Sequence, residues 1–230
     1  TNGASVSANS TGSGAAGSVT VEGANSPAQS VLIDGPGSGI FTDTQGTGAG
    51  GNIFVNANTV TLQNGGTLSA ATSGTNNGGD IQVDATAINL LTFASINTLS
   101  FLSDGSAGNI ALKATQQITA VDSFLNTDAV GGTGLGGNIL LRAPTIGVNG
   151  GVLSTSTSGT GRAGSILLEG QQISLGASPL GGGLGADLFA STNFGSGHGG
   201  TIILRGLDGP SSQADVTISG NSRLQTLTGA

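Results

Sequence analysis

The sequence feature that most constrains the fold is a glycine pattern that recurs along the whole chain. Complete copies of G-x-G-x-x-G end at five glycines, namely Gly17, Gly51, Gly137, Gly164 and Gly200, and degenerate copies end at Gly79 and Gly108. The intervals between these seven corner glycines are 34, 28, 29, 29, 27 and 36 residues. A quasi-period of this length is typical of solenoids and other stacked repeats.

The same glycine pattern binds a dinucleotide pyrophosphate when it lies between a strand and the helix that follows it. Here the copy that ends at Gly51 is followed by Ile53-Phe54-Val55, which reads as a strand. The order of elements is therefore wrong for a cofactor site, and no cofactor is predicted. We expect the glycines to form a return corner, where positive φ and close backbone approach exclude larger residues.

Aliphatic residues alternate with other residues after each corner glycine, which predicts a short strand in every repeat. Further aliphatic pairs predict a second strand, and single markers surrounded by Ser and Thr predict a third: Val6, Ile40, Leu68, Ile96, Leu125, Leu153, Phe189 and Leu224. The predicted fold is all-β, a right-handed parallel β-helix of about seven coils of three strands. Residues 1–230 would form a single segment, either part of a longer array or a subunit whose uncapped ends stack on its neighbours.

Composition excludes several classes of partner. The net charge is −7 and Lys113 is the one lysine, which argues against binding to nucleic acid or to an anionic membrane. No stretch is long and apolar enough to be inserted in a bilayer. His198 is the single histidine and cysteine is absent, so no metal site is predicted.

A small polar residue follows every corner glycine. These residues are Ser18, Asn52, Asp80, Asn109, Asn138, Ser165 and Thr201. Because successive coils stack, we expect their side chains to form a ladder of hydrogen bonds along the rod axis.

Charged residues recur five positions after the corner glycines. In register, they would form a charge ladder of Asp84, Lys113, Arg142, Glu169 and Arg205. Opposite charges that face each other across strands stabilise the pairing and penalise a slip of register. The adjacent cations Lys113 and Arg142 do not fit this scheme.

Three positions after the corner glycines, on the outward side, the later coils carry Leu140, Leu167 and Ile203. A continuous exposed apolar stripe usually marks a covered surface. We interpret these three residues as a packing stripe for another rod or a folded-back segment. Singly exposed aliphatic residues are the alternative.

The consensus carried most fully by residues 50–72, GG-N-I-x-V-x-A-x-x-V-x-L-x-x-G-x-L-S-x-x-T, resembles the repeats of filamentous-haemagglutinin-like exoproteins of the two-partner secretion type, and most of all those of cyanobacteria. The resemblance implies a right-handed β-helix, export through an outer-membrane transporter, and an adhesive or structural role at the cell surface. The Asn-Pro motifs of the family's secretion domain are absent from this sequence.

The sequence therefore favours a non-catalytic structural and adhesive rod, extracellular or on the cell surface, whose partners are itself or cell-surface glycans. Three long segments, 22–30, 176–187 and 206–215, are the expected recognition points. A filament subunit is the second hypothesis. A polysaccharide-active enzyme is the third, but Asp104, Asp122 and Asp128 are dispersed, and Tyr and Trp are absent.

Overall fold

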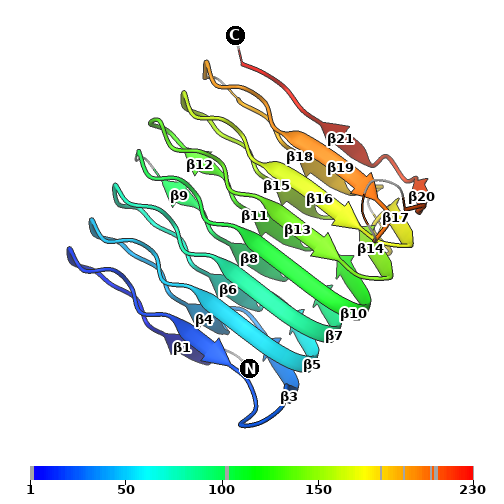
Figure 1. Cartoon of the computed structure of the whole chain (residues 1–230), viewed down its shortest axis with the longest axis horizontal. Helices are drawn as coiled ribbons and strands as arrows, with labels where there is room; N and C mark the ends of the chain where they lie inside the picture. Colours follow the sequence, from blue (N-terminus) through cyan, green and yellow to red (C-terminus); the bar gives the residue numbers. More distant parts are fainter. Residues whose placement is uncertain are drawn as a thin grey trace.

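In the computed structural model the chain is an all-β rod in which parallel coils lie one above another (Figure 1). The structure describes residues 3–101, 104–181, 183–193, 195–207, 209 and 212–229. These residues form twenty-one strands and no helix. The predicted parallel β-solenoid is confirmed.

One side of the rod is an eight-stranded parallel sheet made of the third strands of the coils. Its order follows the chain: β1 (Ser5–Ser7), β4 (Gly39–Phe41), β6 (Thr67–Ser69), β8 (Ser95–Asn97), β11 (Phe124–Asn126), β15 (Val152–Ser154), β18 (Asp187–Phe189) and β21 (Arg223–Gln225). The middle residue of each strand points to the interior.

The remaining sides share an eleven-stranded sheet. Three long strands bend through both sides: β5 (Ile53–Gln63), β7 (Ile81–Leu91) and β10 (Ile110–Val121). In the other coils two shorter strands replace the long one: β2 (Val19–Val21) and β3 (Ala28–Asp34), β13 (Ile139–Arg142) and β14 (Thr145–Asn149), β16 (Ser165–Glu169) and β17 (Gln172–Gly176), and β19 (Thr201–Arg205) and β20 (Asp215–Ile218). Pro144, which has no backbone N–H to donate, separates β13 from β14.

A small sheet and a series of single bridges continue the stacking toward the glycine corner. The sheet pairs β9 (Ser100–Phe101) with β12 (Ala129–Val130). The bridges join Ser10 to Thr44, Thr44 to Thr72 and Thr72 to Ser100 on one stretch, and Ala129 to Thr157 and Thr157 to Thr192 on the next. The coils therefore remain in contact where regular strands have ended.

Aliphatic columns fill the interior. The first-strand isoleucines lie directly over one another and are each at most 1 % exposed; the column contains Ile53, Ile81, Ile110, Ile139 and Ile166. Parallel columns from the second and third strands complete one continuous core. Burial of each such side chain contributes about 1.5–3 kcal/mol, so the stacked columns supply the main stabilising term.

The number of enclosed coils is slightly smaller than the seven expected. Five coils, those that begin at β5, β7, β10, β13 and β16, have a neighbour on both sides. In the outermost coils inward-facing residues are open to solvent: Val6 is 53 % exposed, Val216 43 % and Ile218 51 %.

The corner glycines are required for close approach and not for positive φ. None of the seven has a positive φ, so that part of the prediction is wrong. A Cβ on Gly79 or Gly108 would instead overlap the carbonyl oxygen of Gly51 or Gly79, the corner glycine one coil earlier. Buried threonines complete the corner, since the Oγ1 atoms of Thr42, Thr98 and Thr127 donate to the carbonyl oxygens of Gly51, Gly108 and Gly137 at 2.6, 2.7 and 2.9 Å.

One predicted third-strand marker is wrong by one residue. Leu188, and not Phe189, pairs with Leu153 and Leu224, and it is fully buried. Phe189 points outward, where the Arg223 guanidinium lies 5.5 Å from its ring centroid. The long loop before β18 shifts the phase of the apolar pattern, which the spacing alone did not reveal.

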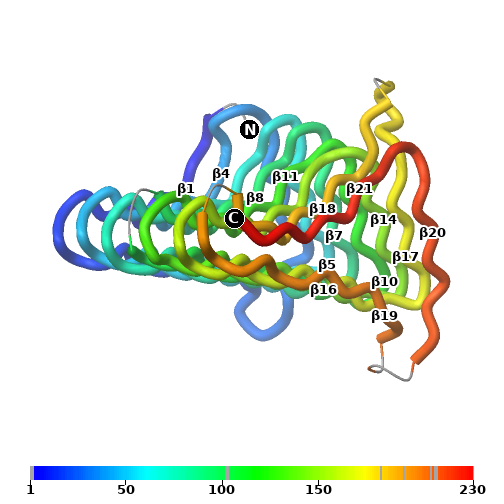
Figure 2. The backbone as a smooth tube through the Cα atoms, turned by 90° about the horizontal axis from the view of Figure 1, so that it is seen from above, coloured from blue at the N-terminus to red at the C-terminus, as the bar shows by residue number. Residues whose placement is uncertain are grey.

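Figure 2 shows three loops that leave the rod, between β2 and β3, between β17 and β18, and between β19 and β20. They correspond to the long segments expected at 22–30, 176–187 and 206–215, although Ala28, Gln29 and Ser30 already belong to β3. Residues 182, 208, 210 and 211 of these segments lie outside the described residues.

Candidate functional site

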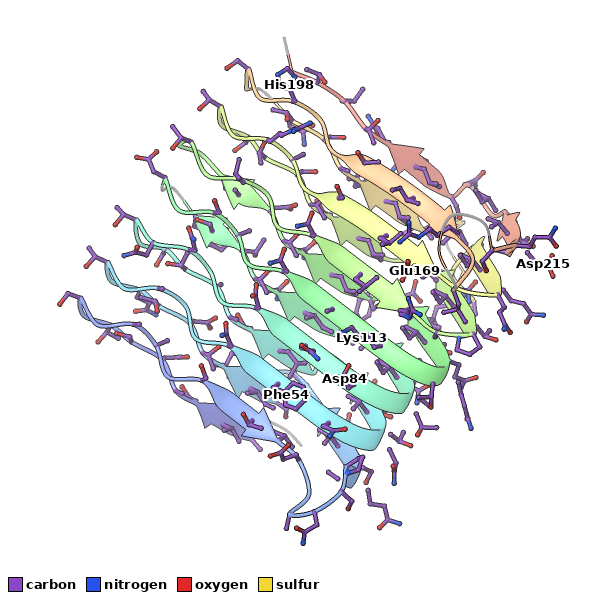
Figure 3. The ribbon with its side chains drawn as sticks, viewed as in Figure 1. Phe54, Asp84, Lys113, Glu169, His198 and Asp215 are labelled. Atoms are coloured by element: carbon purple, nitrogen blue, oxygen red, sulfur yellow. The ribbon has the colours of Figure 1, made fainter. Side chains whose placement is uncertain are left out.

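The charge ladder lies along the outer side of the first strands. The register pairs Asp84 with Lys113, Lys113 with Arg142, Arg142 with Glu169 and Glu169 with Arg205. Figure 3 shows Asp84, Lys113 and Glu169 on one side of the rod. Successive charged residues are therefore direct neighbours across the sheet.

Glu169 lies between Arg142 and Arg205 in the ladder. Its Oε2 accepts a hydrogen bond from Arg142 Nη1 at 2.8 Å, and its Oε1 accepts from Arg205 Nε at 2.8 Å. The Glu169 side chain is 6 % exposed, whereas those of Arg142 and Arg205 are 44 % and 31 % exposed. Burial alone raises the pKa of the Glu169 carboxyl, but the hydrogen bonds and charges of Arg205 and Arg142 outweigh it and hold the pKa below its ordinary value.

The other end of the ladder behaves differently. Among the described residues no ion pair joins Asp84 to Lys113, and Gln82 Nε2 donates to Asp84 Oδ2 at 2.6 Å instead. Register thus brings the two charges side by side without closing a salt bridge. Nothing in the structure explains the adjacent cations Lys113 and Arg142.

The apolar stripe of Leu140, Leu167 and Ile203 is also in register. Leu140 and Leu167 are half-buried, and Ile203 is 40 % exposed. The three side chains stack on one another along the outside of the rod. The partner that would cover them remains a prediction.

The predicted polar ladder forms beside the glycine corner. Asn52 Oδ1 accepts from the backbone N–H of Asp80 at 2.9 Å, and Asp80 Oδ1 accepts from that of Asn109 at 2.7 Å. Asn109 Oδ1 in turn accepts from the backbone of Asn138, and also from its Nδ2, at 2.9 and 3.0 Å. Ser18 and Ser165 extend the ladder at its two ends.

Asp43 and Asp128 each accept two hydrogen bonds from the next coil, an arrangement that we call the aspartate staple. The sequence did not predict it. Asp43 Oδ1 accepts from Ser69 Oγ at 2.6 Å and from the backbone N–H of Ala71 at 2.8 Å. Asp128 Oδ1 accepts from Ser154 Oγ and from the backbone N–H of Ser156, both at 2.6 Å. In both cases the serine follows the aspartate by 26 residues, a signal that alignment on the third strands could have revealed.

A groove surrounds Asp128. Two adjoining cavities, of about 220 and 200 Å³, share Asp128, Ser156 and Asn193. The first is also lined by Ser154, Phe189, Ser191 and Gln225, and the second by Ala129, Val130, Thr157 and Ser158. Burial raises the pKa of the Asp128 carboxyl, although the hydrogen bonds from Ser154 and Ser156 act against this shift.

His198, metal-ligating clusters and membrane-spanning helices are the features that bear on a metal site or on membrane insertion. His198 is exposed in its corner, and the described ranges contain no group of three or more His, Cys, Asp or Glu side chains that could hold a metal ion. In the same ranges no helix could cross a membrane.

The fold and its ladders define the chain as a repeat protein of the parallel β-solenoid class. Comparison with protein-family models, with curated proteins and with solved structures found no match.

Proposed function

We propose that this chain is a structural and adhesive rod segment of a surface-exposed or secreted protein, and that it has no catalytic activity. The observation that carries the proposal is the in-register pairing of every coil with the next, from β1 to β21. Such a ladder stiffens an extended surface on which neighbouring repeats present side chains at a fixed spacing. The resemblance to haemagglutinin-like repeats supports the same role and, with it, export through an outer-membrane transporter.

The experiment that tests this function is surface display. The chain is fused to an inert outer-membrane carrier, and adhesion of the cells to a host-cell or biofilm layer is measured beside the carrier alone. We expect increased adhesion, and no release of reducing ends when the purified chain is incubated with polysaccharides. Adhesion equal to that of the carrier, or depolymerisation of a polysaccharide, would contradict the proposal.

A filament subunit is a second candidate, which the apolar surface at both ends of the rod favours. Val6 at one end and Val216 and Ile218 at the other are inward-facing residues that are 43–53 % exposed. Another coil stacked on either end, from the same chain or from a second copy, would bury them. Fibres in negative-stain electron microscopy would support the filament, whereas discrete short particles at all concentrations would exclude it.

A further inference from the structure

We infer that the groove around Asp128 is a binding site for a neutral glycan. This proposal rests on the adhesive function above. It places recognition on the third-strand face of the rod and not on the loops. The groove extends over four successive coils, from Asp128 through Ser154 and Phe189 to Gln225. At the strand spacing this is a span on the order of 14 Å, which suits an oligosaccharide better than one sugar ring.

The groove has unused hydrogen-bonding capacity. Asp128 uses Oδ1 for both of its hydrogen bonds, and within the described residues Oδ2 accepts none. In those residues Ser123 Oγ is the one buried side-chain N or O atom without a partner, so Oδ2 is open to solvent. The side-chain amides of Asn193 and Gln225 likewise form no hydrogen bond with the described part of the chain.

These groups match the hydroxyl groups of a sugar. A carboxylate oxygen accepts from a hydroxyl, and each amide both donates and accepts. The ring of Phe189, over which the Arg223 guanidinium lies, adds an apolar surface to the groove. The site is thus a small number of convergent polar groups beside one aromatic ring, as in other ligand sites.

The same groove disfavours other ligands. The open carboxylate oxygen of Asp128 repels an acidic glycan. A peptide that binds by strand addition needs a free sheet edge. Here β15 is paired with β11 and β18, and β18 is paired with β15 and β21, so within the described residues the free edge at this groove is that of β21, at the far end of the groove.

Asp43 provides a matched control for a substitution of Asp128. Asp43 and Asp128 make the same staple to the next coil, but only Asp128 lines the two cavities described above. In either position Asn keeps an oxygen for the serine and backbone donors and replaces the second oxygen by an NH₂ group. Asp43→Asn and Asp128→Asn should therefore perturb folding alike and binding differently.

The purified chain is first applied to an array of neutral and acidic glycans, and the strongest neutral ligand is then titrated by calorimetry into the wild type and both variants. We expect binding to neutral glycans, about tenfold weaker binding for Asp128→Asn, and no change for Asp43→Asn. Gln225→Ala serves as a second variant that leaves the staple intact, and it should also weaken binding.

Three results would overturn the inference: no binding to any neutral glycan, preference for acidic glycans, or equal weakening by Asp43→Asn and Asp128→Asn. The surface-display assay separates this failure from that of the proposed function. If displayed wild type and Asp128→Asn adhere equally well, the groove is not the recognition site although the rod is an adhesin. If the displayed wild type does not adhere, the adhesive function itself is wrong.

Discussion

At the scale of the residue, glycine is required at the corners because there is no space for a Cβ atom beside the backbone of the neighbouring coil. Ala in place of Gly108 would place its Cβ on the carbonyl oxygen of Gly79, which is backbone and cannot move without separating the coils. We expect Gly108→Ala to lower the free energy of unfolding by about 1–3 kcal/mol. Chemical denaturation monitored by circular dichroism measures this change.

Gly147 provides the matched control. It lies in β14, where an added Cβ would meet Ser174 Oγ at 3.4 Å and Asn149 Nδ2 at 3.8 Å, which are ordinary contacts. Gly147→Ala should be neutral, or should stabilise by up to about 0.5–1 kcal/mol because the unfolded chain loses freedom. Equal destabilisation by both substitutions would show that steric exclusion is not what selects glycine at the corner.

Glu169 gives a pH dependence with a definite sign. Because its pKa is lower in the folded chain than in the unfolded chain, its stabilisation is complete above the ordinary Glu pKa and disappears as the pH falls through the folded value. We expect Glu169→Gln to cost about 1–2 kcal/mol at neutral pH, since it removes the negative charge and one of the two acceptor oxygens between two partly exposed arginines.

The measurement is the difference in free energy of unfolding between wild type and Glu169→Gln from neutral pH down to below the ordinary Glu pKa. This difference should shrink as the pH falls. A difference that stayed constant, or that grew with acidity, would mean that the two arginines do not stabilise the ionised carboxylate.

At the scale of the element, the polar ladder fixes how one coil sits on the next. Asn109 accepts from Asn138 and donates its Nδ2 to Asp80 Oδ1 at 3.0 Å, so Asn109→Ala removes side-chain bonds to both neighbouring coils. We expect a loss of about 1 kcal/mol, measured by denaturant unfolding. Asn109→Ser should recover part of it, because Ser18 Oγ accepts from the backbone of Asn52 at the same ladder position. Indistinguishable Ala and Ser variants would contradict the ladder's role.

The elements that could be predicted from sequence are those in which every coil has the same type of residue at the same position, because each coil packs on its neighbours in the same way. Ile53, Ile81 and Ile139 share a column because an alternating apolar pattern restarts at each corner glycine. The small polar residues after those glycines predicted the ladder for the same reason.

The parts that were missed depend on local geometry. An insertion changed the phase at Phe189, and Asp84 accepts a hydrogen bond from Gln82 on its own strand although Lys113 lies opposite it. The groove at Asp128 was missed because its residues come from different coils and share no motif. Only the register of the third strands brings them together.

At the scale of the whole molecule, the rod is a sum of neighbour contacts, in which each coil is supported by the coils on either side. The exposed inward-facing residues of the outermost coils follow directly from this arrangement, as does the buried interior of the five coils between them. A groove that runs across several coils exists only while these coils keep their register. The proposed binding in the groove and the stability of the rod therefore depend on the same stacking.

The most direct test of this stacking is disulfide cross-linking, since the natural chain has no cysteine that could interfere. Thr61 and Asn89 are direct partners on the outer face of β5 and β7. The double variant Thr61→Cys with Asn89→Cys should form an intramolecular disulfide in high yield, because adjacent strands bring two Cα atoms within disulfide range. Thr61→Cys with Leu91→Cys, two residues out of register, should remain reduced under the same mild oxidation. Preferential bonding of the second pair, or no bonding of the first, would contradict the in-register solenoid.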